Sequence, residues 1–145
     1  MFDTHCHLTG DRYKDGIDSV LDRARQAGLN GMIAVAIDLS DALEAQSLAE
    51  RHSDVWFTAG VHPSEAGREH DLSGMATLAH HPRCVAWVEM GLDGHLPDPP
   101  MDRQCSLLEQ QLDVVVNTSQ HKLPVVLHSR KAVADVLGML ASAGL

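Results

Sequence analysis

The amino-acid sequence predicts an α/β protein built on a parallel sheet. Five short apolar segments alternate along the 145 residues with five segments whose apolar residues recur every three or four positions. The short segments have the near-continuous hydrophobicity of strands buried on both faces, and the longer ones have the periodicity of amphipathic helices. Strands that alternate with helices form parallel sheets with the helices outside. No long linker interrupts the series, so we expect one domain over residues 1–145.

The first strand is predicted over residues 2–7. In extended backbone, His5 and His7 would point to one side of the strand while Cys6 points to the other. A helix follows, with its apolar face at i, i+3, i+4 and i+7 formed by Ile17, Val20, Leu21 and Ala24. Gly28 is placed to cap the C-terminus of this helix.

The second unit begins with residues 31–37, an almost uninterrupted apolar run that predicts a strand buried on both faces. Asp38 ends this strand, and Ser40 is predicted as the N-cap of the next helix. That helix presents Ala42, Ala45, Leu48 and Ala49 on one face.

The remaining three units repeat the pattern. Predicted strands over residues 55–61, 84–88 and 124–127 lead into His62, Glu89 and His128. The helix after the first of them uses Leu72, Met75, Ala76 and Ala79. A loop rich in glycine and proline, residues 91–100, precedes the next helix, whose apolar face is Leu108, Leu112, Val115 and Val116. The last helix uses Val133, Val136, Leu137 and Leu140.

Metal-capable or acid–base side chains therefore stand at the end of every predicted strand. In parallel α/β folds ligands gather at the carboxyl ends of the strands, so these side chains are expected on one rim. They are His5, His7, Asp38, His62, Glu89 and His128. Five other histidines fall in helices and their flanks, where we expect solvated or capping residues: His52, His70, His80, His81 and His121.

Four of the rim residues are of the right kind to hold one divalent cation, or two that share a carboxylate: His5, His7, Glu89 and His128. Imidazole ligands favour zinc, manganese or iron, and a carboxylate with open water positions also admits magnesium. The alternative for Glu89 is a buried structural carboxylate.

Three further residues are candidates for contact with substrate. Arg130 suits a phosphate or carboxylate oxygen, and its neighbour Lys131 is equally well explained as a solvated residue in the first turn of a helix. His62 is placed to orient substrate or to shape the turn before Pro63. Asp93 is either a residue that supports the metal site or an ordinary loop residue.

Composition narrows the class of function. The net charge of −9 and the lack of a basic run disfavour a protein that coats duplex DNA, but permit attack on an end or on a small molecule. No apolar run approaches the length of a membrane span and no basic-then-apolar leader begins the chain, so no membrane partner is expected. Three cysteines without C-x-x-C spacing favour the reducing cytoplasm.

Four motifs together resemble those of the TatD-type metal-dependent hydrolases, which are amidohydrolase-like (β/α)8 barrels. They are Asp3-Thr4-His5-Cys6-His7-Leu8, Gly60-Val61-His62-Pro63, Glu89-Met90-Gly91-Leu92-Asp93 and the segment from Leu123 to Arg130. The resemblance implies five βα units of a TIM barrel and a divalent-metal hydrolase tested as a deoxyribonuclease or 3′-end exonuclease.

The resemblance also implies residue roles. His5 and His7 would bind a first metal ion, Glu89 would bridge two ions as the catalytic carboxylate, and His128 would bind the second. His62 and Arg130 would lie where such proteins bind phosphate, with Asp93 beside them at the substrate pocket. The family often has an aromatic residue after Gly-Leu-Asp, whereas this chain has Gly94.

Length is the larger departure from the family pattern. Five units of about 29 residues are five-eighths of a barrel that would need about 230. The family's next histidine ligand and its catalytic aspartate would lie beyond Leu145, so we expect weak or no hydrolysis by this polypeptide alone. The alternatives are a non-catalytic metal-binding or interaction fragment, and an ester or amide hydrolase such as an aminoacyl-tRNA deacylase.

An incomplete barrel would also leave its interior side chains uncovered. Those expected to face the interior are Val35, Ile37, Ala59, Val61 and Val126, or their neighbours. An open sheet edge and an uncovered apolar face promote association, so the chain is expected to self-associate.

Overall fold

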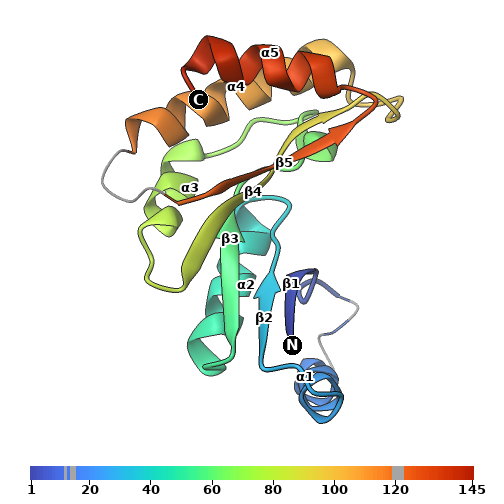
Figure 1. Ribbon diagram of the computed structural model, residues 1–145, viewed down its shortest axis with the longest axis vertical. Helices are drawn as coiled ribbons and strands as arrows, with labels where there is room; N and C mark the ends of the chain where they lie inside the picture. Colours follow the sequence, from blue (N-terminus) through green and yellow to red (C-terminus); the bar gives the residue numbers. More distant parts are fainter. Residues whose placement is uncertain (12, 14–15, 119–122) are drawn as a thin grey trace.

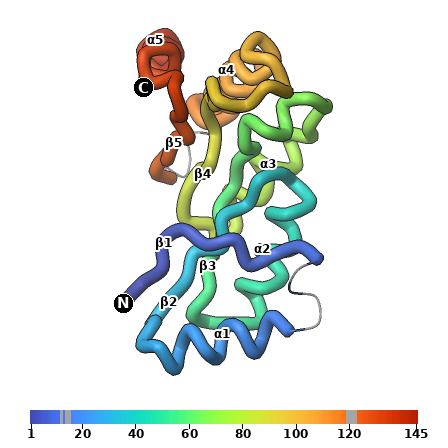
Figure 2. The backbone as a smooth tube through the Cα atoms, turned by 90° about the vertical axis from the view of Figure 1, so that its right-hand side faces the viewer, coloured from blue at the N-terminus to red at the C-terminus, as the bar shows by residue number. Residues whose placement is uncertain are grey.

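A computed structural model describes residues 1–11, 13, 16–118 and 123–145, which form one curled parallel sheet with helices on its outer side (Figures 1 and 2). The strands are β1 (Phe2–Cys6), β2 (Gly31–Ala34), β3 (Val55–Ala59), β4 (Cys84–Asp93) and β5 (Val125–Arg130). The helices are α1 (Ile17–Gln26), α2 (Leu39–Arg51), α3 (Leu72–Ala79), α4 (Met101–Asn117) and α5 (Val133–Ala143), with a short 3-10 helix η1 (Pro63–Glu65).

The spatial order of the strands follows the chain, β1-β2-β3-β4-β5, and each neighbouring pair is parallel. The predicted α/β class and the order of its elements are confirmed. Because each strand lies beside the next one in sequence, β1 and β5 form the two edges of the described sheet, and the chain termini lie at opposite ends of the molecule (Figure 1).

Several predicted boundaries are wrong, and strand pairing explains the largest difference. β2 ends at Ala34 and β3 at Ala59, before the apolar runs end. β4 instead continues to Asp93, because it pairs with β5 as far as the Asp93–Arg130 register position. The predicted loop therefore begins only at Gly94. His128 lies inside β5 rather than after it.

The N-cap of α2 is Asp38, not Ser40. The Asp38 carboxylate accepts a hydrogen bond from the main-chain N–H of Asp41 at 2.8 Å, while Ser40 is exposed in the first helical turn. Asp38 is therefore committed to helix capping, which also explains why it does not join the other rim residues.

The main core lies between the sheet and the helices, and its largest fully buried side chains include Leu21, Phe57, Met75 and Leu108. A second, small cluster on the other face of the sheet consists of Val35, Ala86 and Val88, with Ile33 packed against it. Alternation along β2 explains the division, since Met32 and Ala34 point into the main core and Ile33 and Val35 point away from it.

The predicted set of interior residues is thus only partly right. Val35 lies in the small cluster, but Ala59 at the end of β3 and Val61 just after it belong to the main core, as does Phe57. Ile37 is half-buried, and Val126 is 49% exposed.

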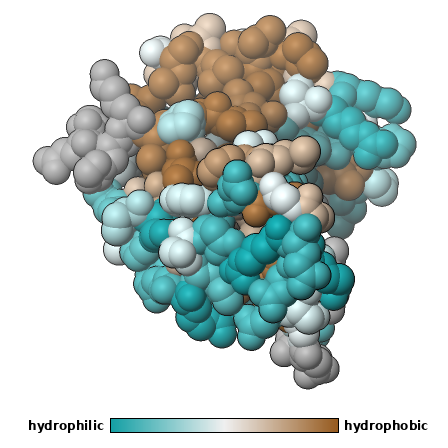
Figure 3. All heavy atoms as spheres, turned by 60° about the horizontal axis from the view of Figure 1, so that its bottom comes forward, coloured by the Kyte–Doolittle hydropathy of each residue, from teal (hydrophilic) through white to brown (hydrophobic). Residues whose placement is uncertain are grey.

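Apolar surface remains around α5. Val116, Val133 and Leu137, which were predicted on buried helix faces, are 44%, 58% and 59% exposed. In the part of the chain that the structure describes, α5 packs on α4, β4 and β5 along one side. Figure 3 shows hydrophobic surface gathered on one side of the molecule and hydrophilic surface on the other.

None of the described helices is long and apolar enough to cross a membrane.

Candidate metal centre

Residues from β1, β4, β5 and the segment after β3 meet at one point of the sheet rim. Two groups of side chains each bring their potential ligand atoms within 4.8 Å of one another. The first group is His5, His7 and Glu89, and the second is His62, Glu89 and His128. Glu89 is common to both groups, so its carboxylate lies between two sets of imidazoles.

The Glu89 carboxylate is central and largely buried, with 15% of its side chain exposed. Its Oε1 lies 3.2 Å from His5 Nε2 and 3.9 Å from His128 Nδ1, and its Oε2 lies 3.8 Å from His7 Nε2. The peptide bond before Glu89 is cis. A carboxylate that faces imidazoles of both groups is suited to share two cations.

The ring of His7 is fixed by the main chain of β2 and the segment after it. Its Nδ1 lies 3.0 Å from the Val35 carbonyl oxygen, which can only accept, so Nδ1 carries the hydrogen. The Nε2 lone pair then faces Glu89, as a metal ligand requires. Cys6 points away and donates its thiol hydrogen to the Ile33 carbonyl. Burial and the charge of Asp3 raise the pKa of Cys6 to about 12, so this thiol stays protonated and is no ligand at neutral pH.

Two glycines allow the strands that carry these ligands to approach. Gly60 (φ 146°) lies against the main-chain carbonyl of Val88, and Gly91 (φ 153°) lies against that of His128. A Cβ at either position would collide with that carbonyl group, and these backbone conformations are strained for other residues. The Gly-Val-His and Glu-Met-Gly sequences therefore place the glycines where the close approach is needed.

Asp93 is buried, with 3% exposure, at the end of β4, so its interpretation as an ordinary loop residue is wrong. Its Oδ2 lies 3.1 Å from His128 Nε2, and its Oδ1 accepts the main-chain N–H of His95 at 2.8 Å. Burial would raise the pKa of Asp93, but these two hydrogen bonds and the charge of Arg130 outweigh it and lower the pKa below the usual value. Arg130 itself is exposed at the end of β5.

His62 follows β3 and caps η1. Its Nδ1 accepts the main-chain N–H of Ser64 at 3.1 Å, and its Nε2 lies 3.3 Å from His128 Nδ1. Burial lowers the pKa of His62, and the neighbouring His128 lowers it further. Both effects favour the neutral ring of His62.

Two buried glutamines on α4 support the site and were not singled out from the sequence. Gln104 accepts the Asp93 N–H at 2.8 Å and donates to the Asp93 carbonyl, while Gln111 makes the same pair of bonds with Val61, next to His62. They are 1% and 2% exposed. Their spacing could have indicated them from the sequence. Residues seven apart lie on one face of a helix, and this face is the apolar one that carries Leu108 and Leu112.

The other predicted rim and surface residues lie outside the cluster. Asp38 caps α2 and pairs with Arg68, so it lies outside the cluster. His52 and His80 are C-caps, His70 bonds to the Glu65 carbonyl, and His81 pairs with Glu50, as expected for residues outside the site. His121 lies outside the described residues.

A sequence-family model described as TatD related DNase matches residues 2–145. The chain belongs to the TatD-related DNase family. It is 30% identical over 146 residues to a metal-dependent hydrolase of Bacillus subtilis named YabD, covering 99% of this chain and 56% of that protein. It is 37% identical over 135 residues to the 3′-5′ ssDNA/RNA exonuclease TatD of a Rahnella species, covering 91% of this chain and 50% of that protein.

Solved structures agree with this membership. The Escherichia coli TatD homologue YJJV superposes with a TM-score of 0.85 at 30% identity, over 99% of this chain and 56% of that one. A TatD-family hydrolase of Entamoeba histolytica gives a TM-score of 0.85 at 25% identity, over 99% and 54%. These TatD barrels identify the curled sheet as part of a TIM-type barrel. The chain spans about half the length of the relatives it matches.

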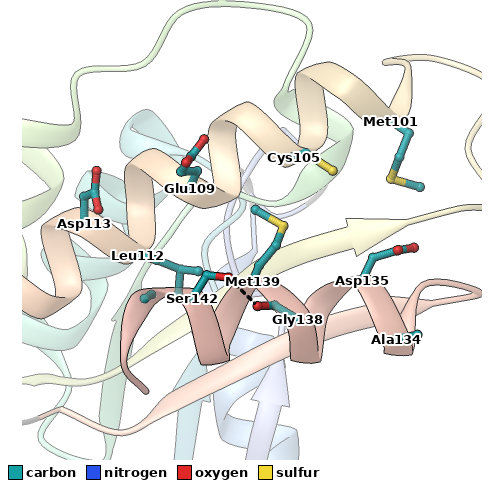
Figure 4. A pocket seen from close by; sticks show the side chains of 11 residues that line it. Met101, Cys105, Glu109, Leu112, Asp113, Ala134, Asp135, Gly138, Met139 and Ser142 are labelled. Carbon is teal, nitrogen blue, oxygen red and sulfur yellow. Dashed lines mark hydrogen bonds between the residues drawn. The ribbon is translucent and has the colours of Figure 1, made fainter.

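The residues of this TatD-related chain fit the divalent metal that the family implies. Nδ1 of His7 is engaged by the Val35 carbonyl, which leaves Nε2 on the side of Glu89, and Glu89 is a largely buried carboxylate surrounded by imidazole nitrogens. A groove of about 680 Å³ between α4 and α5 lies elsewhere (Figure 4). It is lined by residues such as Cys105, Glu109 and Met139, and none of the predicted site residues contributes to it.

Proposed function

We propose that the whole protein is a divalent-metal-dependent phosphodiesterase that removes nucleotides from the 3′ ends of single-stranded DNA. The observation that carries this proposal is the position of Glu89, shared between two groups of metal-capable side chains. Two cations held by a common carboxylate are suited to phosphodiester hydrolysis. Relatives of this chain carry the names metal-dependent hydrolase and 3′-5′ ssDNA/RNA exonuclease, which favours nucleic-acid ends as substrate.

The proposal assigns a role to each residue of the site. His5, His7 and Glu89 hold a first ion, and Glu89 and His128 contribute to a second. Zinc and manganese suit this imidazole-rich set, and magnesium is a further candidate. Bound ions supply a water molecule of lowered pKa and neutralise phosphate charge. His62 and Arg130 contact the phosphate oxygens. Asp93 supports His128, which is one of the two alternatives predicted from the sequence, rather than lying at the substrate pocket with them.

Metal binding is the first test. Titration of the metal-free 145-residue protein with zinc or manganese should show one ion bound with useful affinity, and a second bound more weakly. The variants His5→Ala and His7→Ala should abolish the tighter site, while His81→Ala, on the α3 side of the sheet, should leave it unchanged. No binding, or binding that both rim variants retain, would reject the site.

Hydrolysis is the second test. The 145-residue polypeptide, loaded with zinc, manganese or magnesium, is assayed on single-stranded DNA labelled at either end. We expect weak release of 3′ nucleotides at most, reduced by a further 10²-fold or more in Glu89→Ala. Turnover that Glu89→Ala leaves unchanged would contradict the assignment of Glu89.

The cytoplasm is the compartment that this proposal implies. The cysteines Cys6, Cys84 and Cys105 are free. Free, largely buried thiols are typical of proteins that work in a reducing compartment.

A further inference from the structure

We propose that Asp93 is a positioning residue that sets where the hydrogens lie on His128 and His62. In this arrangement His128 Nδ1 keeps a lone pair directed toward Glu89, and His62 Nε2 carries a hydrogen directed into the same space. The inference rests on the proposed function only in naming a cation and a substrate oxygen as the partners of these two atoms. The arrangement itself belongs to the metal-free chain.

The hydrogen on His128 is determined by Asp93. An ionised carboxylate can only accept hydrogen bonds, and Asp93 Oδ2 lies 3.1 Å from His128 Nε2. The other oxygen of the same carboxylate is already engaged by the main-chain N–H of His95 at 2.8 Å. In the neutral form of the ring, Nε2 therefore carries the hydrogen, and Nδ1, 3.9 Å from Glu89 Oε1, keeps its lone pair.

The hydrogen on His62 is determined independently, from the other end. The main-chain N–H of Ser64 donates to His62 Nδ1 at 3.1 Å, so the hydrogen of the neutral ring lies on Nε2. That Nε2 is 3.3 Å from His128 Nδ1, where it meets the lone pair that Asp93 leaves there. The contacts from Ser64 to Asp93 thus form one chain in which every donor meets an acceptor.

The opposite arrangement on His128 would fail at both of its contacts. With the hydrogen on Nδ1, two N–H groups would face each other across the 3.3 Å to His62, and the Nε2 lone pair would face the Asp93 carboxylate. The contact with Asp93, by setting the hydrogen on His128, therefore prepares both histidines for their roles. His128 offers a lone pair to a cation. His62 belongs to the same group of potential ligands, but it acts as a hydrogen-bond donor to a substrate oxygen.

Asp93 is itself held in place from both sides. Gln104 binds the main-chain N–H and carbonyl of Asp93 and also donates to the Pro99 carbonyl at 2.8 Å. These bonds fix the main chain of Asp93, and the His95 N–H holds its carboxylate in the orientation that faces His128.

The substitution Asp93→Asn tests the inference because it changes almost no volume. The His95 N–H requires an oxygen, so the amide group of asparagine would point its NH₂ toward His128 Nε2. That contact would move the His128 hydrogen to Nδ1. Long-range ¹H–¹⁵N spectra of the metal-free protein, with histidines labelled, report the tautomer directly. We expect Nε2–H for His128 in the unsubstituted protein and Nδ1–H in Asp93→Asn.

Zinc binding gives a second readout. The zinc concentration that shifts the His128 signals should rise about tenfold or more in Asp93→Asn, the usual effect of losing a partner of a metal-binding histidine. Asp3→Asn is the matched control. It removes the same charge and keeps the same contact with the main-chain N–H two residues on, at His5, so the His128 tautomer should not change.

Two results would overturn the inference. An Nδ1–H tautomer of His128 in the unsubstituted, metal-free protein contradicts it without any variant, so it stays testable even if Asp93→Asn fails to fold. A folded Asp93→Asn protein that keeps Nε2–H on His128 also contradicts it. Zinc that never shifts the His128 signals would count against the proposed function instead, because the tautomers are read in the absence of metal.

Discussion

At the scale of single residues, the ion pair between Arg25 and Asp54 lies at the amino ends of the strands, across the sheet from the metal centre. Arg25 donates from Nε and Nη2 to the two carboxylate oxygens of Asp54, both at 2.8 Å, and Arg25 also bonds to Asp22. This two-point contact ties α1 to the turn before β3. A parallel guanidinium–carboxylate pair is stronger than a single exposed ion pair.

We expect Asp54→Asn to lower the free energy of unfolding by about 1–2 kcal/mol at pH 7. The hydrogen bonds from Arg25 lower the pKa of Asp54 relative to the unfolded chain. The stabilisation is therefore fully present above the unfolded value, about 4, and is lost as the pH falls through the lower folded value. Urea unfolding at pH 7 and pH 3 should show the difference between the proteins shrinking at the acid pH.

Asp22→Asn is the control for this prediction. It removes a carboxylate that contacts the same arginine at 2.9 Å but is 63% exposed, so its loss should cost less than about 0.5 kcal/mol. Equal effects of the two variants would mean that the two-point geometry contributes nothing.

At the scale of elements, the site depends on how closely β4 and β5 approach. Gly91→Ala would place a methyl group against the His128 carbonyl, in a backbone conformation that side chains rarely adopt. We expect a loss of about 2–3 kcal/mol in stability and weaker metal binding, because the ligands Glu89 and His128 are separated by the same shift. Thermal unfolding and zinc titration of the same samples measure both.

Gly138→Ala makes the matched comparison. Gly138 lies inside α5 with open space around its added Cβ, so alanine should stabilise the helix by up to about 1 kcal/mol. If Gly91→Ala were as stable as the unsubstituted protein, the close approach would not be needed.

The cap of α2 is Asp38 in the structure, whereas the sequence predicts Ser40. Asp38→Ala should destabilise the protein by about 1 kcal/mol, since it removes the acceptor for the Asp41 N–H. Ser40→Ala should have almost no effect, because Ser40 is exposed in the first turn. Thermal melts of both variants decide it, and a larger loss for Ser40→Ala would restore the sequence-based assignment.

At the scale of the whole molecule, the described sheet has two edge strands and an apolar side. Val126 on β5 and Val133 and Leu137 on α5 are exposed together at this end of the chain. Exposed strand edges beside apolar surface pair readily with other chains. We therefore predict that the 145-residue polypeptide self-associates.

Light scattering on the purified polypeptide measures its mass in solution and so tests this prediction. We expect a mass above 15.7 kDa that rises with concentration, and a shift toward monomer in the variant Leu137→Lys. The control Leu43→Lys adds the same charge at another exposed apolar residue, 51% exposed on α2, and should leave the association unchanged. A cooperative monomer at all concentrations would show that the edge and the apolar side do not drive association.

The sequence by itself determined the α/β class, the order of the elements and the residues that gather at the rim. Local periodicity is enough for this, because strand alternation and helix spacing are properties of neighbouring residues. It also predicted the four metal-capable residues His5, His7, Glu89 and His128, which the fold brings together, and the family to which the four motifs belong. Asp38 also ends a predicted strand but belongs to neither metal-capable group, because its carboxylate caps α2 and pairs with Arg68.

Only the tertiary structure decided how the site is built. The contact of Asp93 with His128, the support from Gln104 and Gln111, and the close approach at Gly60 and Gly91 all join residues on different elements. No local pattern encodes such distances, because strand pairing decides where β4 and β5 end and which side chains then face each other. The same holds for α5, whose periodic apolar face is buried only where another element lies against it.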